Sequence, residues 1–234
     1  MQIEVFSDVV CPWCYIGKRR LEQALSTFPH ADEVTITYRS FQLDPTAPRR
    51  SEETLEQHLA TKYGRTLDEA RQMNQRVSDV AATVGLDFRL ADAQRGNTFD
   101  AHRLLQLAAA RGRQPELKER LMKAYFSEGA LLSDHDELAA LAAEVGLDRT
   151  EVAAVLAGDD YADAVRADLA LARGFGVTGV PFFVVDRTYG VSGAQEAAVL
   201  VDVLQRAWTE AHPLTVVTPD GPADDCADGV CEVR

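Results

Sequence analysis

Cys11 and Cys14 form a C-x-x-C pair, with Pro12 and Trp13 between them. The pair follows the apolar, β-like run 3–6 and precedes a helical pattern, and this junction is typical of thiol–disulfide exchange. At a helix N-terminus, free backbone N–H groups and the positive end of the helix dipole favour a thiolate at Cys11. Pro12 suits the first helical position, where its missing N–H is not needed. Cys14 is close enough to attack a mixed disulfide formed at Cys11.

The helix that follows the pair predicts different surroundings for the two thiols. Over residues 12–28 the apolar positions recur at near-heptad spacing and include Cys14, whereas Cys11 lies at the cap. We therefore expect an exposed nucleophile at Cys11 and a sheltered resolving thiol at Cys14. A zinc site would need a second cysteine pair, and the Pro-Trp spacer contains no glycine to shape a zinc knuckle, so the motif favours redox chemistry.

The surrounding pattern predicts an α/β fold with a large helical segment. A strand at 2–6, a helix at 12–28 and a strand at 34–41 make a βαβ unit with a parallel pair. Candidate helices follow at 52–63, 66–84, 97–111, 115–127, 134–145, 149–157 and 160–172. Ser51, Asn97 and Asp148 are candidate N-caps, and Gly85, Gly112, Gly146 and Gly158 are candidate helix ends. Strands are then expected at 180–185 and 189–192, and an amphipathic helix at 194–211.

The charge and length of the chain exclude several functional classes. The 234 residues can bury a sizeable core, and their net charge of −13 argues against nucleic acid or an anionic membrane as a partner. We see no apolar run as long as a transmembrane helix. Residues 1–4 contain neither a basic n-region nor an apolar h-region, so we expect a cytoplasmic protein. In a reducing cytosol, close cysteine pairs indicate catalysis, redox sensing or metal binding more than a structural framework.

Three segments of the sequence resemble the FrnE-like branch of the DsbA family of thioredoxin-fold proteins. They are F-S-D-x-x-C-P-W-C-Y-x-G at 6–17, N-T-x-x-A-H-R-L at 97–104 and G-V-T-G-V-P-F-F at 176–183. The resemblance spans about residues 3–211. It implies a thioredoxin-like fold with a large all-helical insertion. We expect the thioredoxin-like domain at 1–48 and 173–211, the helical insertion at 49–172, and an acidic tail at 212–234.

The resemblance also implies which residues meet the substrate. In such proteins a cis proline faces the cysteines, and the residue before it offers backbone hydrogen bonds to a bound peptide. These positions are Pro181 and Val180 here, and X-Pro bonds tolerate the cis form well. We expect them to bind substrate together with Pro12 and Trp13. Strongly oxidising relatives usually carry histidine where this chain has Trp13, so strong oxidising power does not follow.

Four further residues have open roles. Asn97 and His102 either line the substrate cleft or are an ordinary N-cap and a partly buried helix residue, and we favour the ordinary roles. Cys226 and Cys231 form a second pair among acidic residues near the end of the chain. Nearby carboxylates raise the pKa of such thiols. The pair is a candidate auxiliary redox pair, a small structural disulfide or a free pair, and the resemblance makes the auxiliary role more plausible.

Our first hypothesis is a thiol–disulfide oxidoreductase or isomerase that acts on protein or small-molecule thiols and disulfides and needs no metal or organic cofactor. Under this hypothesis Cys11 reacts as a thiolate, and the negative charge of the nearby Asp8 opposes the formation of that thiolate. A second hypothesis is a glutathione-dependent enzyme of the kappa-class transferase and hydroxychromene carboxylate isomerase group. That group generally has serine where this chain has Cys11 and lacks the second cysteine. The third hypothesis is a Cys₄ zinc-binding redox sensor.

Overall fold

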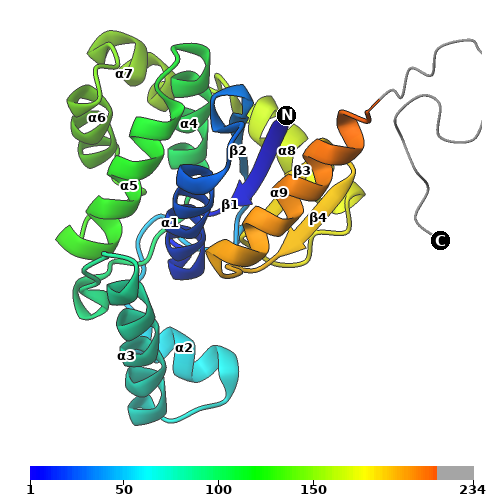
Figure 1. Ribbon diagram of the computed structural model, residues 1–234. Coiled ribbons are helices and arrows are strands. Elements are labelled where there is room, and N and C mark those ends of the chain that lie inside the picture. Colours follow the sequence, from blue (N-terminus) through cyan, green and yellow to red (C-terminus); the bar gives the residue numbers. More distant parts are fainter. Residues whose placement is uncertain (215–234) are drawn as a thin grey trace, which may run out of the picture.

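The computed structural model describes residues 1–214, which form a four-stranded sheet and the helices around it (Figure 1). The strands are β1 (Gln2–Ser7), β2 (Thr35–Ser40), β3 (Phe182–Val185) and β4 (Tyr189–Ser192), and they are arranged in the order β2-β1-β3-β4. β1 pairs in parallel with β2 and antiparallel with β3, and β3 pairs antiparallel with β4. The parallel pair predicted from the strand–helix–strand pattern is therefore confirmed.

Helices cover both faces of this sheet. α1 (Pro12–Thr27) and α9 (Ala197–Ala211) pack side by side on one face, where Val5 and Phe183 lie in a common core with both helices. α8 (Ala162–Gly174) covers the other face, where Phe6 points to the opposite side from Val5. This alternation follows from the two-residue period of side chains along a strand. The sheet is thus enclosed by helices, as the thioredoxin fold requires.

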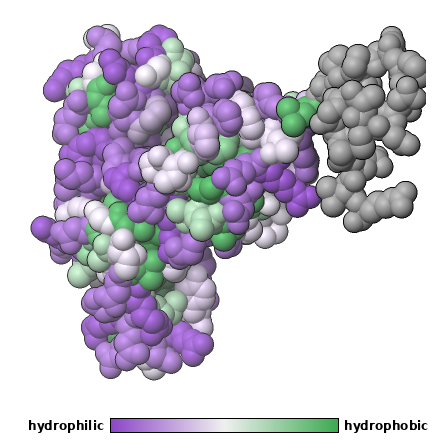
Figure 2. Space-filling view, viewed as in Figure 1, coloured by the Kyte–Doolittle hydropathy of each residue, from purple (hydrophilic) through white to green (hydrophobic). Residues whose placement is uncertain are grey.

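The remaining helices lie between β2 and α8 in the sequence and form the helical insertion. They are α2 (Leu55–Tyr63), α3 (Leu67–Thr83), α4 (Phe99–Ala110), α5 (Gln114–Glu128), α6 (His135–Glu144) and α7 (Arg149–Ala157). A short 3₁₀ turn, η2 (Leu90–Asp92), lies between α3 and α4, and another, η1 (Ala31–Glu33), lies before β2. α4 and α5 share a core with α1, and α6 and α7 pack on α5 and α4 farther from α1, whereas α2 and α3 project as an arm from the body (Figure 1). Hydrophobic residues gather where this arm meets the body on the face shown in Figure 2.

Several elements begin later than the sequence predicts: α8 begins at Ala162 rather than 160, α9 at Ala197 rather than 194, and β3 at Phe182 rather than 180. The reason is visible at two further starts. α2 begins after Thr54 rather than Ser51, because Thr54 and Gln57 form a reciprocal capping box. α4 begins after Thr98, and Asn97 is not its N-cap, although its Oδ1 accepts the backbone N–H of Phe99. Asp148 caps α7 as predicted, through the N–H of Glu151. The expected division into domains stays a prediction.

Candidate functional site

Cys11 occupies the N-cap of α1, directly after the loop that leaves β1. Its extended backbone lets Pro12 begin the helix, and its carbonyl accepts the N–H groups of Cys14 at 3.0 Å and Tyr15 at 3.3 Å. Both cysteines are free thiols. Cys14 is 2% exposed, as its place on the apolar face predicts, but Cys11 is only 4% exposed. The expectation of an exposed nucleophile was wrong, because Cys11 lies at the base of a cleft that the helical insertion helps to build.

The loop before β3 lies against Cys11. The Val180–Pro181 peptide bond is cis, as expected, and the Cys11 Sγ–H donates to the Val180 carbonyl oxygen at 3.6 Å. Gly17 of α1 makes this approach possible, because a Cβ there would lie 3.0 Å from Pro181 Cγ. A helix with a larger residue at this position could not pack as closely on the loop. The nucleophile candidate and the backbone edge at 179–180 therefore meet at one point.

Three polar side chains are buried beneath the cysteines, and two of them come from the insertion. Asp8 accepts the backbone N–H of Val9 and of Leu43, both at 2.8 Å, and its Oδ1 lies 3.1 Å from His102 Nε2 of α4. The Nζ of Lys118, on α5, lies 3.4 Å from the carbonyl oxygen of Ser7. All three side chains are almost fully buried. The sequence analysis did not single out Lys118, although a lysine within the apolar face of a helix is the signal that could have found it.

Burial and charge set the ionisation of these groups. Burial raises the pKa of the Asp8 carboxyl, but hydrogen bonds from His102 and Leu43 and the charges of His102 and Lys118 outweigh it, so the net pKa is lowered. Burial raises the pKa of the Cys14 thiol well above its usual range, and the neighbouring Cys11 adds to this. Burial lowers the pKa of Lys118 to about 8, against the opposing charges of Cys14, Asp8 and Cys11. One buried region thus contains a carboxylate, a thiol with a raised pKa and a lysine with a lowered pKa.

The cleft above Cys11 has a volume of about 350 Å³ and largely apolar walls. Its walls come from α2 and α3, the loop around Leu43, the end of α5 and the loop at Val180. Trp13, Leu43 and Tyr63 lie at its border and are exposed. Arg95, a half-buried cation in its wall, forms ion pairs with Glu53 at 2.7 Å and Asp44 at 3.6 Å. Such a cleft suits an apolar side chain or a small apolar molecule next to the Cys11 sulfur.

The structure brings together only part of the predicted site. Cys11, Pro12, Trp13 and Val180 line the cleft, and Pro181 packs behind it. His102 does not line the cleft, and it is fully buried rather than partly buried because it contacts Asp8.

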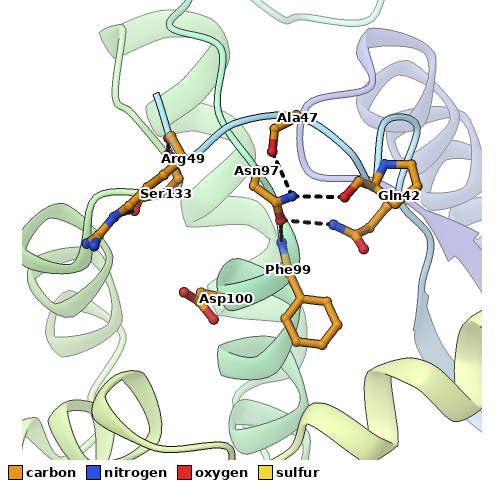
Figure 3. A pocket seen from close by; sticks show the side chains of 8 residues that line it. Gln42, Ala47, Arg49, Asn97, Phe99, Asp100 and Ser133 are labelled. Atoms are coloured by element: carbon orange, nitrogen blue, oxygen red, sulfur yellow. Dashed lines mark hydrogen bonds between the residues drawn. The ribbon is translucent and has the colours of Figure 1, made fainter. Parts of the chain in front are cut away.

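Asn97 lies in a neighbouring hollow on the other side of the loop at 42–48 (Figure 3). Its Nδ2 donates to the carbonyls of Pro45 and Ala47, and its Oδ1 accepts the Nε2–H of Gln42 at 3.2 Å. Asn97 therefore fixes the loop that forms one wall of the cleft. Its role is indirect, because it contacts that wall from behind.

Cys226 and Cys231 lie outside the described residues, so their expected auxiliary role and the Cys₄ zinc alternative stay predictions. Within residues 1–214, no group of three or more histidine, cysteine or acidic side chains is placed to hold a metal ion. In the same part of the chain, no helix is both long and apolar enough to cross a membrane.

Comparison with known proteins agrees with this geometry. The solved structure of a probable DsbA oxidoreductase from Streptomyces coelicolor is 44% identical with a TM-score of 0.88, over 96% of this chain and 99% of that one. The uncharacterized protein YwbO of Bacillus subtilis is 26% identical over 80% of this chain and 88% of its own. The cytosolic disulfide reductase DsbM of Pseudomonas aeruginosa, also solved with GSH, shares the fold at 17% identity and a TM-score of 0.60, over 88% of this chain and all of DsbM.

The sequence model of one family matches almost the whole described chain. Its match covers residues 2–205, which include the C-x-x-C pair, the helical insertion and the cis-proline loop. The sheet order, the parallel β1–β2 pair and the helices on both faces fit that match. The chain belongs to the DSBA-like thioredoxin domain family.

Proposed function

We propose that this protein is a cytoplasmic thiol–disulfide oxidoreductase or isomerase that acts on protein dithiols and disulfides through Cys11 and Cys14. The observation that carries the proposal is the contact between the Cys11 sulfur and the Val180 carbonyl at the base of an open, apolar cleft. This contact places the nucleophile beside a free backbone edge. An extended substrate can pair with such an edge while its own sulfur reaches Cys11.

The reaction needs two exchanges of sulfur. Cys11 as a thiolate attacks a substrate disulfide, forms a mixed disulfide and releases the first substrate thiol. Cys14 then attacks Cys11, forms the Cys11–Cys14 disulfide and releases the second thiol. The same two steps in reverse, starting from the Cys11–Cys14 disulfide, oxidise a substrate dithiol. The apolar rim at Trp13, Leu43 and Tyr63 supports an unfolded protein as substrate, because such chains expose apolar side chains.

The cytoplasmic location is part of the proposal. It is supported by DsbM, which shares the fold and is named as a cytosolic disulfide reductase. In that compartment the protein would meet low-molecular-weight thiols, and the cleft is large enough for a small molecule as well as a side chain.

The test is the reduction of insulin disulfides, and the oxidation of a reduced model protein, by the wild type and single-cysteine variants. Cys11→Ser removes the nucleophile and is expected to abolish both activities. Cys14→Ser is expected to stop turnover but to accumulate a mixed disulfide, visible by mass spectrometry. A double variant, Cys226→Ser with Cys231→Ser, measures the contribution of the second pair, since only a relay would lose rate.

Two outcomes would replace the proposal. Turnover retained by Cys11→Ser would refute the mechanism. An activity that survives Cys14→Ser and requires glutathione would instead favour the glutathione-dependent class.

A further inference from the structure

Helix α2 carries an apolar stripe that the rest of the described chain leaves half covered. Leu55, Leu59 and Tyr63 recur at every fourth residue, so they share one face of the helix, and all three line the cleft above Cys11. Within residues 1–214, α2 has no buried residue, and Tyr63 is 53% exposed. An amphipathic helix normally buries its apolar face against a core. The α2 stripe instead faces an open cleft that leads to the nucleophile.

The apolar surface continues from this stripe to the Cys11 sulfur. Further apolar and aromatic side chains from α1, α3, α5 and the loop after β2 line the cleft, among them Trp13, Leu43, Met73, Val77, Tyr125 and Phe126. Single exposed apolar residues are ordinary on a protein surface. A contiguous apolar cleft that ends at a reactive thiol has the character of a binding site.

The charged side chains in and beside the cleft are already paired with one another. Glu53 binds Arg95 at 2.7 Å and lies 3.4 Å from His58, and Arg95 also reaches Asp44. Of the cations that line the cleft in the described part of the chain, Lys62 alone has no ion pair, and it lies in the last, exposed turn of α2. A charged substrate residue in the body of the cleft would therefore lose its water without gaining a partner, whereas an apolar residue would lose no hydrogen bond.

The chemistry at the base of the cleft decides what fills it. During exchange the substrate is bonded through its own sulfur to Cys11, which is only 4% exposed. The backbone edge at Val180 lies against the same sulfur, so the substrate cysteine and the residues beside it are held at this point. The side chain next to that cysteine is then the group within reach of the apolar walls.

We propose that the arm formed by α2 and α3 selects substrates in which a large apolar residue stands directly beside the reacting cysteine. Leu59, in the middle of the α2 stripe, is the specificity-determining residue. This selection rests on the proposed function, because it requires exchange at Cys11. The substrate is a disulfide in an unfolded segment, since folded proteins bury most large apolar side chains.

The selection acts on the first exchange. The Cys11 thiolate attacks one sulfur of the substrate disulfide, a bond forms between Cys11 and that sulfur, and the substrate disulfide bond breaks. The electron pair leaves with the second substrate sulfur, which takes up a proton from solvent. In the same step the apolar neighbour passes from water into the cleft, so its burial favours the mixed disulfide and the transition state that leads to it.

The test compares peptide disulfides that differ only beside the cysteine. Each is a disulfide-linked dimer of acetyl-Ser-X-Cys-X-Ser-amide, where X is leucine, serine, glutamate or lysine on both sides, so the direction of binding does not matter. The reduced protein reacts with each dimer in a single turnover, and acid quenching with chromatography measures the released peptide thiol. Rates with dithiothreitol correct for the intrinsic reactivity of each disulfide. After this correction, the leucine peptide is expected to react roughly 10-fold faster than the other three.

Two leucines of the arm provide matched variants. Leu59→Gln places a polar group in the α2 stripe and is expected to lower the ratio of leucine to serine rates at least about threefold. Leu67→Gln changes a leucine at the start of α3 that is 43% exposed and does not line the cleft, so it should keep the wild-type ratio. Neither leucine is buried, so both variants are expected to fold, which thermal unfolding verifies.

Different results would overturn the selection and the proposed function. Equal rates for the four peptides, a fastest rate for glutamate or lysine, or a full leucine preference in Leu59→Gln would overturn the selection by the arm. If bis(2-hydroxyethyl) disulfide reacted as fast as the leucine peptide, the cleft would take a small molecule instead. A rate per site that falls as protein concentration rises would mean that a second copy of the chain covers the cleft. If no peptide reacts, or if Cys11→Ser matches the wild type, the proposed function itself fails. The wild-type series decides the selection even if Leu59→Gln does not fold.

Discussion

Asp8 is the residue that connects the cysteine motif with the helical insertion. It follows β1 directly, and its carboxylate binds the N–H of Leu43 on one side and His102 of α4 on the other. A single buried side chain thus holds both the loop at Leu43, which forms a wall of the cleft, and helix α4. The sequence analysis treated Asp8 as a charge that opposes a thiolate, but its hydrogen bonds give it a structural role as well.

Asp8→Asn is expected to destabilise the protein by about 1–3 kcal/mol at pH 7. Asparagine offers one acceptor oxygen, and its amide NH₂ would face an N–H donor in either orientation. The lowered pKa of Asp8 gives the pH dependence. Its carboxylate contributes stability above the unfolded-state pKa of about 3.9, and this contribution is lost as pH falls through the lower folded-state value. The difference between wild type and variant should therefore narrow below about pH 4.

Urea unfolding at pH 7 and pH 3 measures this difference. Asp202→Asn, at an exposed position on α9, is the control and should match the wild type at both pH values. A gap that stays constant between pH 7 and pH 3 would contradict the assignment of the ionised carboxylate.

Local signals were enough to predict Cys11 and Cys14, because the C-x-x-C spacing and the strand–helix junction depend on a few neighbouring residues. The cis step at Val180–Pro181, which faces the cysteines, was expected from the resemblance to the DsbA family. The contact of Asp8 with His102 could not be predicted, since the two residues are 94 positions apart along the chain, and neither could the burial of Lys118 beneath the cysteines. Their contacts depend on how α4 and α5 pack on α1, which periodicity does not specify. The burial of Cys11 was missed for the same reason.

At the scale of elements, the contact between α1 and the cis-proline loop sets the geometry of the site. Gly17 faces Pro181, Phe183 and Ala194, and a Cβ on Gly17 would lie 3.0, 3.3 and 3.5 Å from atoms of these three side chains. Gly17 costs α1 some helix stability relative to alanine, by about 1 kcal/mol. What it provides is the close approach that brings the Cys11 sulfur to the Val180 carbonyl.

Gly17→Ala is expected to lower both stability and exchange rate. Overpacking costs about 1–3 kcal/mol, which outweighs the gain in helix propensity. The helix must also shift from the loop, which moves Cys11 from Val180 and slows the first exchange. Gly174→Ala is the matched control, because it lies in α8 with open space where its Cβ would be. It should be neutral or stabilising by up to about 1 kcal/mol.

Thermal unfolding measures the stability of each variant. The rate at which its reduced form releases the first thiolate from 5,5′-dithiobis(2-nitrobenzoate) measures the first exchange. If Gly17→Ala matched Gly174→Ala in both stability and rate, the close approach of α1 to the loop would be unimportant.

At the scale of the molecule, the insertion and the cysteine helix share one hydrophobic core. Cys14 and Ile16 of α1 belong to the same buried cluster as Leu104 of α4 and Leu121 of α5. The insertion is contiguous in sequence, yet it has no core that excludes α1. α8 connects the two parts further, because it packs on the sheet and on α4. The arm formed by α2 and α3 is different, since α2 has no buried residue.

A shared core predicts that the described body unfolds in one cooperative transition. Circular dichroism at 222 nm reports mainly the helices, most of which belong to the insertion, whereas tryptophan fluorescence reports Trp13 and Trp208, the only two tryptophans of the chain. Unfolding of either the insertion or the sheet with its helices would expose the shared cluster on α1. The circular dichroism and the fluorescence should therefore give the same urea midpoint. In Trp208→Phe, Trp13 beside the cysteines is the single fluorescent tryptophan. The unfolding curves from fluorescence and from circular dichroism should still coincide in this variant. A helical transition that precedes the fluorescence change would mean that the insertion unfolds independently and that the core across α1 adds little stability.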